Sequence, residues 1–256
     1  MITILREFVQ SFLTFLERVG LLVRFALRLA AILPTGVLRP RPIIEQVYNT
    51  GAMSLVIIMT CGLFVGMVLG LQGHDLLQRF GSEDSLGTGA ALALLKELGP
   101  VVTALLFAGR AGTALASELG LMRATDQLSA MEIMAVDPMR RVVVPRFLGG
   151  AISMPLLTGV FIMVGLFGVQ LVGVQLLGVD QGQFWSQMRG AVELDDIYEG
   201  LIKGVVFGIA CSLIAVFEGY NAQPTAEGVG RATTRTVVIS AVVTLVLDYI
   251  LTALML

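Results

Sequence analysis

The feature that most constrains this sequence is a run of twenty residues, Ala52 to Leu71, without a charged side chain. The hydrocarbon core of a bilayer is about 30 Å thick, and a helix needs about 20 apolar residues to cross it. The composition of the whole chain agrees, with 56% hydrophobic and 14% charged residues, whereas soluble domains carry about a quarter charged residues. The sequence therefore predicts an integral membrane protein.

Four further apolar stretches follow the first one. The fold class that we expect is an all-α integral membrane protein, with about five transmembrane helices and an N-terminal amphipathic interfacial helix. The transmembrane domain is expected over residues 34–256, with spans at about 50–72, 87–117, 147–176, 199–218 and 235–256. The third stretch, Phe147 to Val179, has no charge and exceeds one straight span, which predicts a helix that runs past the bilayer before it breaks.

The first 33 residues have the pattern of a helix that lies on a membrane surface. Their apolar residues recur at helical spacing while charged and polar residues fill much of the other face. Arginines at 18, 24 and 28 interrupt any apolar core, which argues against a signal peptide. We expect the three prolines that follow to break the helix and form a short linker; these are Pro34, Pro40 and Pro42.

The distribution of basic residues predicts the orientation, because cytoplasmic loops of membrane proteins are enriched in lysine and arginine. With a cytoplasmic N-terminus, thirteen arginines lie at or inside the inner boundary, and only Arg79 and Arg189 fall in outer loops. The acidic residues between 180 and 199 also concentrate in an outer loop. The C-terminus is then expected on the outer side of the membrane, and the protein is expected to cross it several times.

Three spans carry small residues at every fourth position, a spacing that lets helix backbones approach closely in lipid. We interpret these stripes as packing faces within one subunit, with a seam between subunits or a substrate groove as the alternatives. The stripes are Gly62, Gly66 and Gly70; Ala104, Ala108, Gly112, Ala116 and Gly120; and Gly200, Gly204, Gly208 and Ser212.

Charged side chains inside a span are costly and are candidates for function. From the predicted span directions and a rise of about 1.5 Å per residue, four such residues lie in the outer half of the bilayer. One hypothesis is a set of ion pairs between helices that stabilises packing. The other is a polar wall that receives a charged lipid head group. The four residues are Lys96, Glu97, Lys203 and Asp248.

The segment between the second and third spans is cytoplasmic by the charge distribution. A short helix is expected at about 125–138, with Thr125 or Asp126 as its N-terminal cap and Pro138 beyond its end. Its apolar residues have a charged rim, which suits docking into a groove on another protein. The alternative is an amphipathic helix that rests on the bilayer or on its own subunit.

The sequence lacks the residues that several functional classes require. The sequence has no Gly-Lys-Ser or Gly-Lys-Thr loop to hold nucleotide phosphates and no basic tract for nucleic acid. One histidine, His74, rules out a multi-histidine metal site, and we expect it to be solvated in a loop. Cys61 and Cys211 lie in apolar runs and are expected to be buried thiols. We therefore predict no catalytic residue, no metal and no cofactor in this chain.

From about Val47 onward the sequence resembles the MlaE (YrbE) permease family. The resemblance depends on several long motifs in order, namely Glu97-Leu-Gly-Pro-Val-Val, Phe107-Ala-Gly-Arg-Ala-Gly-Thr-Ala, Glu118-Leu-Gly-Leu-Met-Arg-Ala-Thr-Asp-Gln-Leu, Met131-Glu-Ile-Met-Ala-Val-Asp-Pro and Gly230-Arg-Ala-Thr-Thr-Arg-Thr-Val-Val.

This resemblance implies the permease subunit of an ABC transporter that works as a homodimer. The implied partners are two cytoplasmic ABC ATPase subunits, which bind ATP and Mg²⁺, a small STAS-domain protein and a hexamer of periplasmic MCE-domain proteins. The implied substrate is phospholipid, which moves between the inner membrane and a periplasmic path to the outer membrane. This transport maintains the lipid asymmetry of the outer membrane.

The resemblance also implies roles for particular residues. The inner-loop helix is similar to a coupling helix that seats in the ATPase, a role carried onto Asp126, Gln127, Met131, Glu132, Met134, Val136 and Asp137. A lipid pocket at the dimer interface would involve Lys96, Glu97, Leu98, Leu69, Leu77 and Phe80. Their depth in the membrane adds Lys203 and Asp248 to this group.

Two other functional classes remain as alternatives. A secondary, ion-coupled transporter of a lipophilic substrate predicts inverted repeats and helices broken near the midplane, but five spans do not divide into two halves. An intramembrane enzyme needs a nucleophile with a base, or a metal cluster, and one histidine supplies neither.

Overall fold

The computed structural model describes residues 2–37 and 40–255, and every regular element in those residues is a helix. Five of the helical stretches are long and apolar enough to cross a membrane, as the sequence predicted. These stretches are Pro40–Gln78, Leu86–Ala124, Met139–Leu176, Leu194–Tyr220 and Ala226–Met255.

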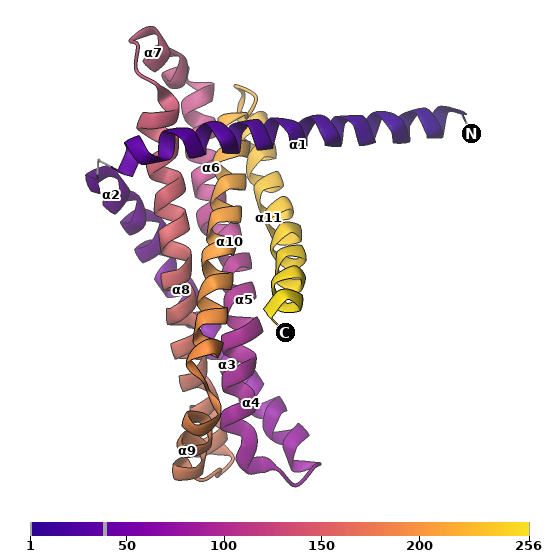
Figure 1. The fold of residues 1–256 in the computed structure, drawn as a ribbon, viewed down its shortest axis with the longest axis vertical. Helices are drawn as coiled ribbons and strands as arrows, with labels where there is room; N and C mark the ends of the chain where they lie inside the picture. Colours follow the sequence, from indigo (N-terminus) through magenta and orange to yellow (C-terminus); the bar gives the residue numbers. More distant parts are fainter. Residues whose placement is uncertain (1, 38–39, 256) are drawn as a thin grey trace.

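The spans are built from helices that join end to end (Figure 1). The first contains α2 (Pro40–Gly51) and α3 (Leu55–Gln78), and the second contains α4 (Leu86–Ala93), α5 (Gly99–Phe107) and α6 (Thr113–Ala124). The third is mainly α8 (Val144–Gln170), and the last two are α10 (Leu194–Tyr220) and α11 (Ala226–Met255). Short helices α7 (Gln127–Ile133) and α9 (Gln181–Ala191) connect spans at opposite ends of the bundle.

Wide π-helical turns interrupt the second span and form both ends of the third. They occupy Leu94–Leu98, Ala108–Gly112, Met139–Val143 and Leu171–Leu176. A π-turn inserts a residue into the α-helical register and occurs often at functional sites. The turn at Leu94–Leu98 contains both Lys96 and Glu97, so it changes the direction in which these two side chains leave the helix.

The N-terminal helix α1 (Ile2–Val37) lies across the α7 end of the bundle (Figure 1). It is attached there by apolar side chains: Leu29 is buried, and the ring of Phe25 meets that of Phe217 edge-on, with centroids 5.5 Å apart. The expectation that Pro34 ends this helix is wrong, because α1 continues through Pro34 to Val37. Proline at this position removes one backbone hydrogen bond and crowds the carbonyl four residues earlier, which can kink a helix without ending it.

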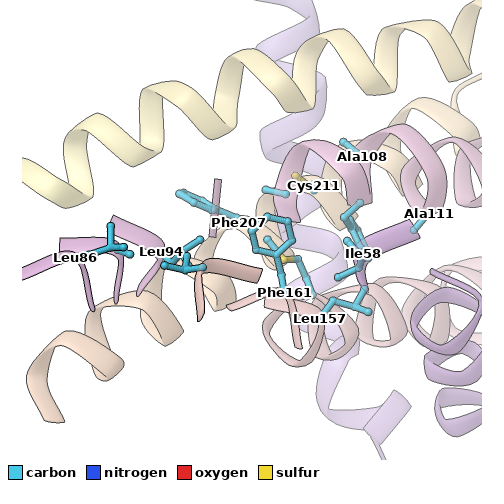
Figure 2. Close-up of a cluster of buried hydrophobic side chains, with 14 of the residues drawn as sticks. Ile58, Leu86, Leu94, Ala108, Ala111, Leu157, Phe161, Phe207 and Cys211 are labelled. Atoms are coloured by element: carbon cyan, nitrogen blue, oxygen red, sulfur yellow. The ribbon is translucent and has the colours of Figure 1, made fainter. Parts of the chain in front are cut away.

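The main core fills the space between α3, α5, α8 and α10. Ile58, Phe107, Phe161 and Phe207 are fully buried there, and Figure 2 shows their neighbours converging from separate helices. A second, smaller core lies under α1 at the α7 end and includes Leu29. The two cores make the described spans one packed bundle.

The glycine stripes are packing faces inside this bundle, as expected. A Cβ atom at Gly66 would lie 2.0 Å from the carbonyl oxygen of Gly165, so α3 and α8 touch through their backbones. A Cβ atom at Gly200 would lie 2.4 Å from the carbonyl oxygen of Leu95, on the neighbouring π-turn. Because these faces are buried within the subunit, the first stripe does not supply the dimer surface that the alternative interpretation assigned to it.

Two smaller expectations concern single residues. Cys211 is buried and Cys61 is partly buried, and both are free thiols. The expectation of a solvated loop histidine is wrong, because α3 extends to Gln78 and includes His74, whose side chain is buried. Its Nδ1 atom has no hydrogen-bond partner among the residues that the structure describes.

Candidate functional site

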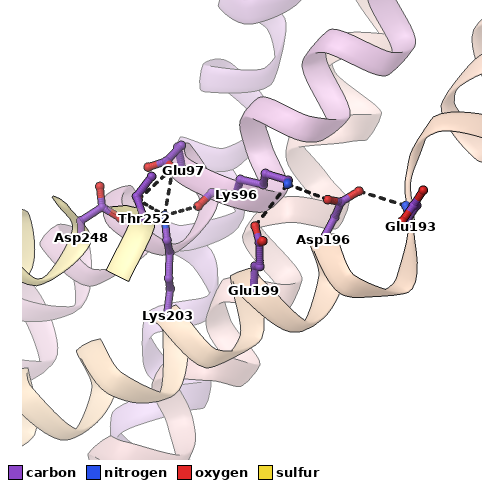
Figure 3. Close-up of polar contacts among 8 residues, drawn as sticks. All are labelled: Lys96, Glu97, Glu193, Asp196, Glu199, Lys203, Asp248 and Thr252. Atoms are coloured by element: carbon purple, nitrogen blue, oxygen red, sulfur yellow. Dashed lines mark hydrogen bonds and ion pairs between the residues drawn. The ribbon is translucent and has the colours of Figure 1, made fainter. Parts of the chain in front are cut away.

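The ionisable residues predicted inside the spans form a cluster between the second, fourth and fifth spans (Figure 3). At its centre lies Lys203 of α10, which is only 1% exposed. Its ammonium lies 3.0 Å from Glu97 Oε1 and 3.1 Å from Asp248 Oδ1. One lysine thus joins carboxylates from two other spans, and a lysine buried this deeply requires such partners.

Two neutral oxygens complete the surroundings of Lys203. The ammonium donates to Thr252 Oγ1 at 2.7 Å and to the backbone carbonyl of Lys96 at 2.8 Å. That carbonyl lies four residues before Pro100, which has no N–H to donate to it. Pro100 and the π-turn therefore leave a backbone acceptor for the lysine of another helix. Thr252 also donates to Glu97 Oε1 at 3.1 Å, so the cluster is a connected network.

Lys96 makes a second ion-pair group beside the first. Its ammonium lies 2.8 Å from Asp196 Oδ1 and 3.3 Å from Glu199 Oε2, both on α10. Asp196 also accepts the backbone N–H of Glu193 at 2.9 Å, within a capping box that starts α10. Lys96 therefore contacts the start of α10, whereas Glu97 contacts Lys203, further along α10, and Thr252 of α11.

The pairing confirms that ion pairs link the spans, but sequence reasoning missed three of the partners. Asp196 and Glu199 were expected in an outer loop, and Thr252 was not considered. The spacing of 196, 199 and 203 places all three on one helix face, and Thr252 follows Asp248 by one turn. Helical spacing alone was therefore enough to group them.

The cluster is only partly closed. The side chains of Lys96 and Glu97 are 37% and 45% exposed, while that of Lys203 is 2% exposed. Charges that face outward from a desolvated network can bind a zwitterionic or anionic group without separating the buried pairs. The described residues contain no group of three or more His, Cys, Asp or Glu side chains that could hold a metal ion.

The apolar residues assigned to the same pocket have two kinds of environment. Leu69, Leu77 and Leu98 are partly buried and pack against the main core. Phe80, just beyond the end of α3, is 76% exposed. The structure therefore leaves Phe80 available to lipid or to another chain.

The predicted coupling residues lie at the opposite end of the bundle, on and after α7 (Figure 1). Gln127, Glu132, Met134 and Val136 are exposed, and Met131 packs partly against the smaller core. The most exposed apolar side chain here is Ile133, at 87%. Ile133 is not among the coupling residues that the resemblance implied.

Two acidic residues bracket this segment. Asp126 is the N-terminal cap residue of α7, as one of the two expected positions, and it has a left-handed backbone (φ 56°) and no capping hydrogen bond from its side chain. Asp137 accepts the backbone N–H of Met139 at 3.0 Å and lies 3.8 Å from Arg28 of α1. The segment is therefore attached to the bundle at its end and offers its apolar tip to solvent.

Comparison with known proteins decides the family. A family model described as Permease MlaE matches residues 43–254 of this chain. The chain belongs to the MlaE permease family. The resemblance found in the sequence motifs is thereby confirmed over nearly the whole length beyond α1.

Individual relatives agree with this membership of the MlaE family. The intermembrane phospholipid transport system permease protein MlaE of Haemophilus influenzae is 56% identical over 214 residues, which are 83% of this chain and 82% of that protein. A probable ABC transporter permease protein of Rickettsia typhi is 36% identical, with the same coverage of both chains. The chloroplast protein TRIGALACTOSYLDIACYLGLYCEROL 1 of Arabidopsis thaliana is 32% identical over 85% of this chain and 62% of its own length.

Proposed function

We propose that this MlaE-family chain is the permease subunit of an ABC transporter that moves phospholipid between the inner membrane and a periplasmic MCE-protein path to the outer membrane. The observation that carries the proposal is the 56% identity to a relative named as an intermembrane phospholipid transport permease. In Gram-negative cells this activity maintains the lipid asymmetry of the outer membrane.

The geometry supports two separate working ends. An ionic cluster with partly exposed charges lies toward one end of the spans, and an exposed helix with an apolar tip lies at the other. One helical stretch, Leu86–Ala124, carries Lys96 and Glu97 and leads directly to α7. With a rise of about 1.5 Å per residue, Lys96 lies about 42 Å from the end of that stretch.

The proposed orientation places α1 and α7 in the cytoplasm and α9 and the C-terminus in the periplasm. The excess of arginine at the α7 end supports it. In this orientation α1 is an interfacial helix at the inner surface. The cluster lies in the outer half of the bilayer, where an MCE-domain hexamer can receive lipid.

The proposed complex contains two copies of this chain, two ATPase subunits and a STAS-domain protein. ATP and Mg²⁺ bind to the ATPase subunits, and this chain contributes no cofactor site. Each α7 seats in an ATPase subunit through its apolar tip, with the acidic side chains of Glu132 and Asp137 at the rim.

The proposed mechanism is mechanical. Closure of the ATPase pair moves α7, and the helical stretch Leu86–Ala124 carries the motion to the π-turn at Leu94–Leu98. This turn holds Lys96 and Glu97, whose partners are on α10 and α11. A shift there changes the space between the two copies and displaces a lipid toward or from the periplasmic path.

The coupling role is tested by charge reversal on α7. Glu132→Lys places a cation at the proposed rim, and like-charge or unpaired contacts at such an interface weaken binding by about tenfold. We expect ATPase co-purification to fall, or ATP hydrolysis to continue without transport. Glu227→Lys, an exposed site at the same end of the bundle, is the matched control. Normal ATPase recovery together with normal transport in Glu132→Lys would refute the docking role.

The lipid-binding role is tested at the partly exposed carboxylate. Glu97→Gln keeps the size of the side chain and its contact with Thr252 but removes the charge. We expect less phospholipid to co-purify with an intact complex, measured by mass spectrometry of extracted lipids. If the complex falls apart instead, the cluster is purely structural. Transport that stops with an uncoupler but survives loss of the ATPase would favour the ion-coupled alternative.

A further inference from the structure

A second lipid-accessible feature lies outside the ionic cluster, in a groove between α8 and α10 near α9. The groove has a volume of about 490 Å³, and its walls are almost entirely apolar. Pro155, Ile162 and Leu166 of α8 form one wall, and Leu201 of α10 forms part of the other. Met163 and Leu201 are exposed, so the groove opens to the surroundings of the bundle.

The length of the groove matches one leaflet of a bilayer. Its wall on α8 runs from Pro155 to Leu166, which corresponds to about 16 Å at a rise of about 1.5 Å per residue. Half of a hydrocarbon core of about 30 Å is about 15 Å. An acyl chain of the leaflet on the α9 side therefore fits along the groove.

The groove is separate from the cluster around Lys203. Leu201 and Lys203 are two positions apart on α10, about 200° around the helix axis, so they occupy opposite faces. Gly200 and Leu95 also line the groove, and a Cβ atom at Gly200 would lie 2.4 Å from the carbonyl oxygen of Leu95, so the two backbones close this wall of the groove. A lipid in the groove would not touch the ammonium of Lys203.

A basic side chain lies at the α9 end of the groove. Arg189, in the last turn of α9, lines it together with Met188 and Val192. Arg189 is exposed and has no ion pair with any residue that the structure describes. Arg189 and Arg79 are the only basic residues that the proposed orientation places in outer loops, and Arg79 pairs with Asp75 at 2.9 Å.

We propose that this groove binds one phospholipid of the periplasmic leaflet, with an acyl chain between α8 and α10 and the phosphate on Arg189. The apolar groove of leaflet length complements an acyl chain, and the unpaired guanidinium at its end complements the phosphate. The site goes beyond the proposed function, because it lies on the outside of the subunit and binds lipid without the ionic cluster. Only the assignment to the periplasmic leaflet rests on the proposed orientation.

Photocrosslinking tests the site. The transporter, purified with its native partner subunits, is placed in nanodiscs that contain phosphatidylethanolamine with a diazirine in its acyl chain. We expect labelled peptides from residues 155–166 of α8. A cation near the membrane surface contributes about 1 kcal/mol to anion binding, so Arg189→Gln should reduce this labelling about fivefold. Arg79→Gln, the matched control, should leave it unchanged.

A second variant tests the groove without changing charge. A Cβ atom at Gly159, which lines the groove, meets nothing within 4 Å. Gly159→Phe therefore places a ring where the acyl chain would lie without displacing other protein atoms, and labelling of α8 should fall to background. Gly20→Phe, whose Cβ atom also meets open space, should not alter it.

Three outcomes would overturn the proposal. The first is labelling of α8 that is equal in Arg189→Gln and in the unaltered protein. The second is labelling that survives Gly159→Phe. The third is a phosphate-free diacylglycerol probe that labels α8 as strongly as the phospholipid. We expect Glu97→Gln to leave the labelling of α8 unchanged even where it impairs lipid transport. Transport by Glu97→Gln therefore tests the proposed function, and the labelling of α8 tests this site, so their failures are distinguishable.

Discussion

Removal of the central lysine should destabilise the protein more than removal of its neighbour. Lys203→Met deletes an ammonium that donates three hydrogen bonds of 2.7 to 3.0 Å and lies 3.1 Å from the carboxylate of Asp248. Breaking a buried ion pair by deleting one partner costs about 3–5 kcal/mol, because the other charge stays buried. Asp248 is only 18% exposed, whereas Glu97 is 45% exposed and regains water. We therefore expect the lower end of the range, about 3 kcal/mol.

The same reasoning gives a smaller effect for Lys96→Met. Lys96 is more exposed than Lys203, and Asp196 keeps the backbone N–H of Glu193 as a donor. Exposed ion pairs contribute at most about 1 kcal/mol. A change of 1 kcal/mol shifts the Tm by about 2–4 °C in a chain of 150–250 residues. The expected loss is about 6–12 °C for Lys203→Met and about 2–4 °C for Lys96→Met.

Thermal unfolding of the purified protein in detergent, followed by the fluorescence of Trp185, measures both shifts. The sharper comparison adds Glu97→Gln and Asp248→Asn to Lys203→Met, which leaves a neutral network. Neutral replacement of a buried ion group is often harmless, so this triple variant should recover most of the lost Tm. Equal shifts for the two lysine variants, or a triple variant no better than Lys203→Met, would refute the argument from burial.

Two further predictions concern packing and the start of the first span. Gly66→Ala should lower stability by about 1–3 kcal/mol, because its Cβ atom would lie 2.0 Å from a backbone oxygen of α8. The control Gly89→Ala, which has open space at its Cβ atom, should be neutral or slightly stabilising. Equal Tm values for the two variants in thermal unfolding would contradict the backbone contact. Arg110→Met should cost about 2 kcal/mol, because its guanidinium donates to the carbonyl oxygens of Asn49 and Thr50; an unchanged Tm would show that these bonds contribute nothing.

The ionic cluster shows which features of the membrane-embedded charges can be predicted from the sequence of one chain and which cannot. Span number and the presence of four ionisable residues in the membrane followed from hydropathy. The pairing did not, because a carboxylate 50 or 100 residues away is invisible to local pattern. Glu97 and Asp248 meet at Lys203 only because α5, α10 and α11 pack together, with the π-turn setting the direction of the carboxylate.

Other local features also depended on the surrounding structure. The sequence placed His74 in a polar loop, since Asp75 and Arg79 follow it, but the helix continues and packing buries the ring. Proline at 34 predicted a break, yet α1 tolerates it in its last turn. For His74 the local signal was correct about polarity and packing decided the burial, whereas for Pro34 the local signal for a helix end was wrong.

The sequence by itself determined that this chain crosses a membrane, how many times it does so, and which family it belongs to. These properties depend on composition, periodicity and motif order, all of which are local or nearly local along the chain. Only the tertiary structure decided which acidic group neutralises which lysine, which glycines bring backbones together, and where a groove of leaflet length opens. Those outcomes depend on distances between residues far apart in the chain, and such distances exist only after the helices have packed.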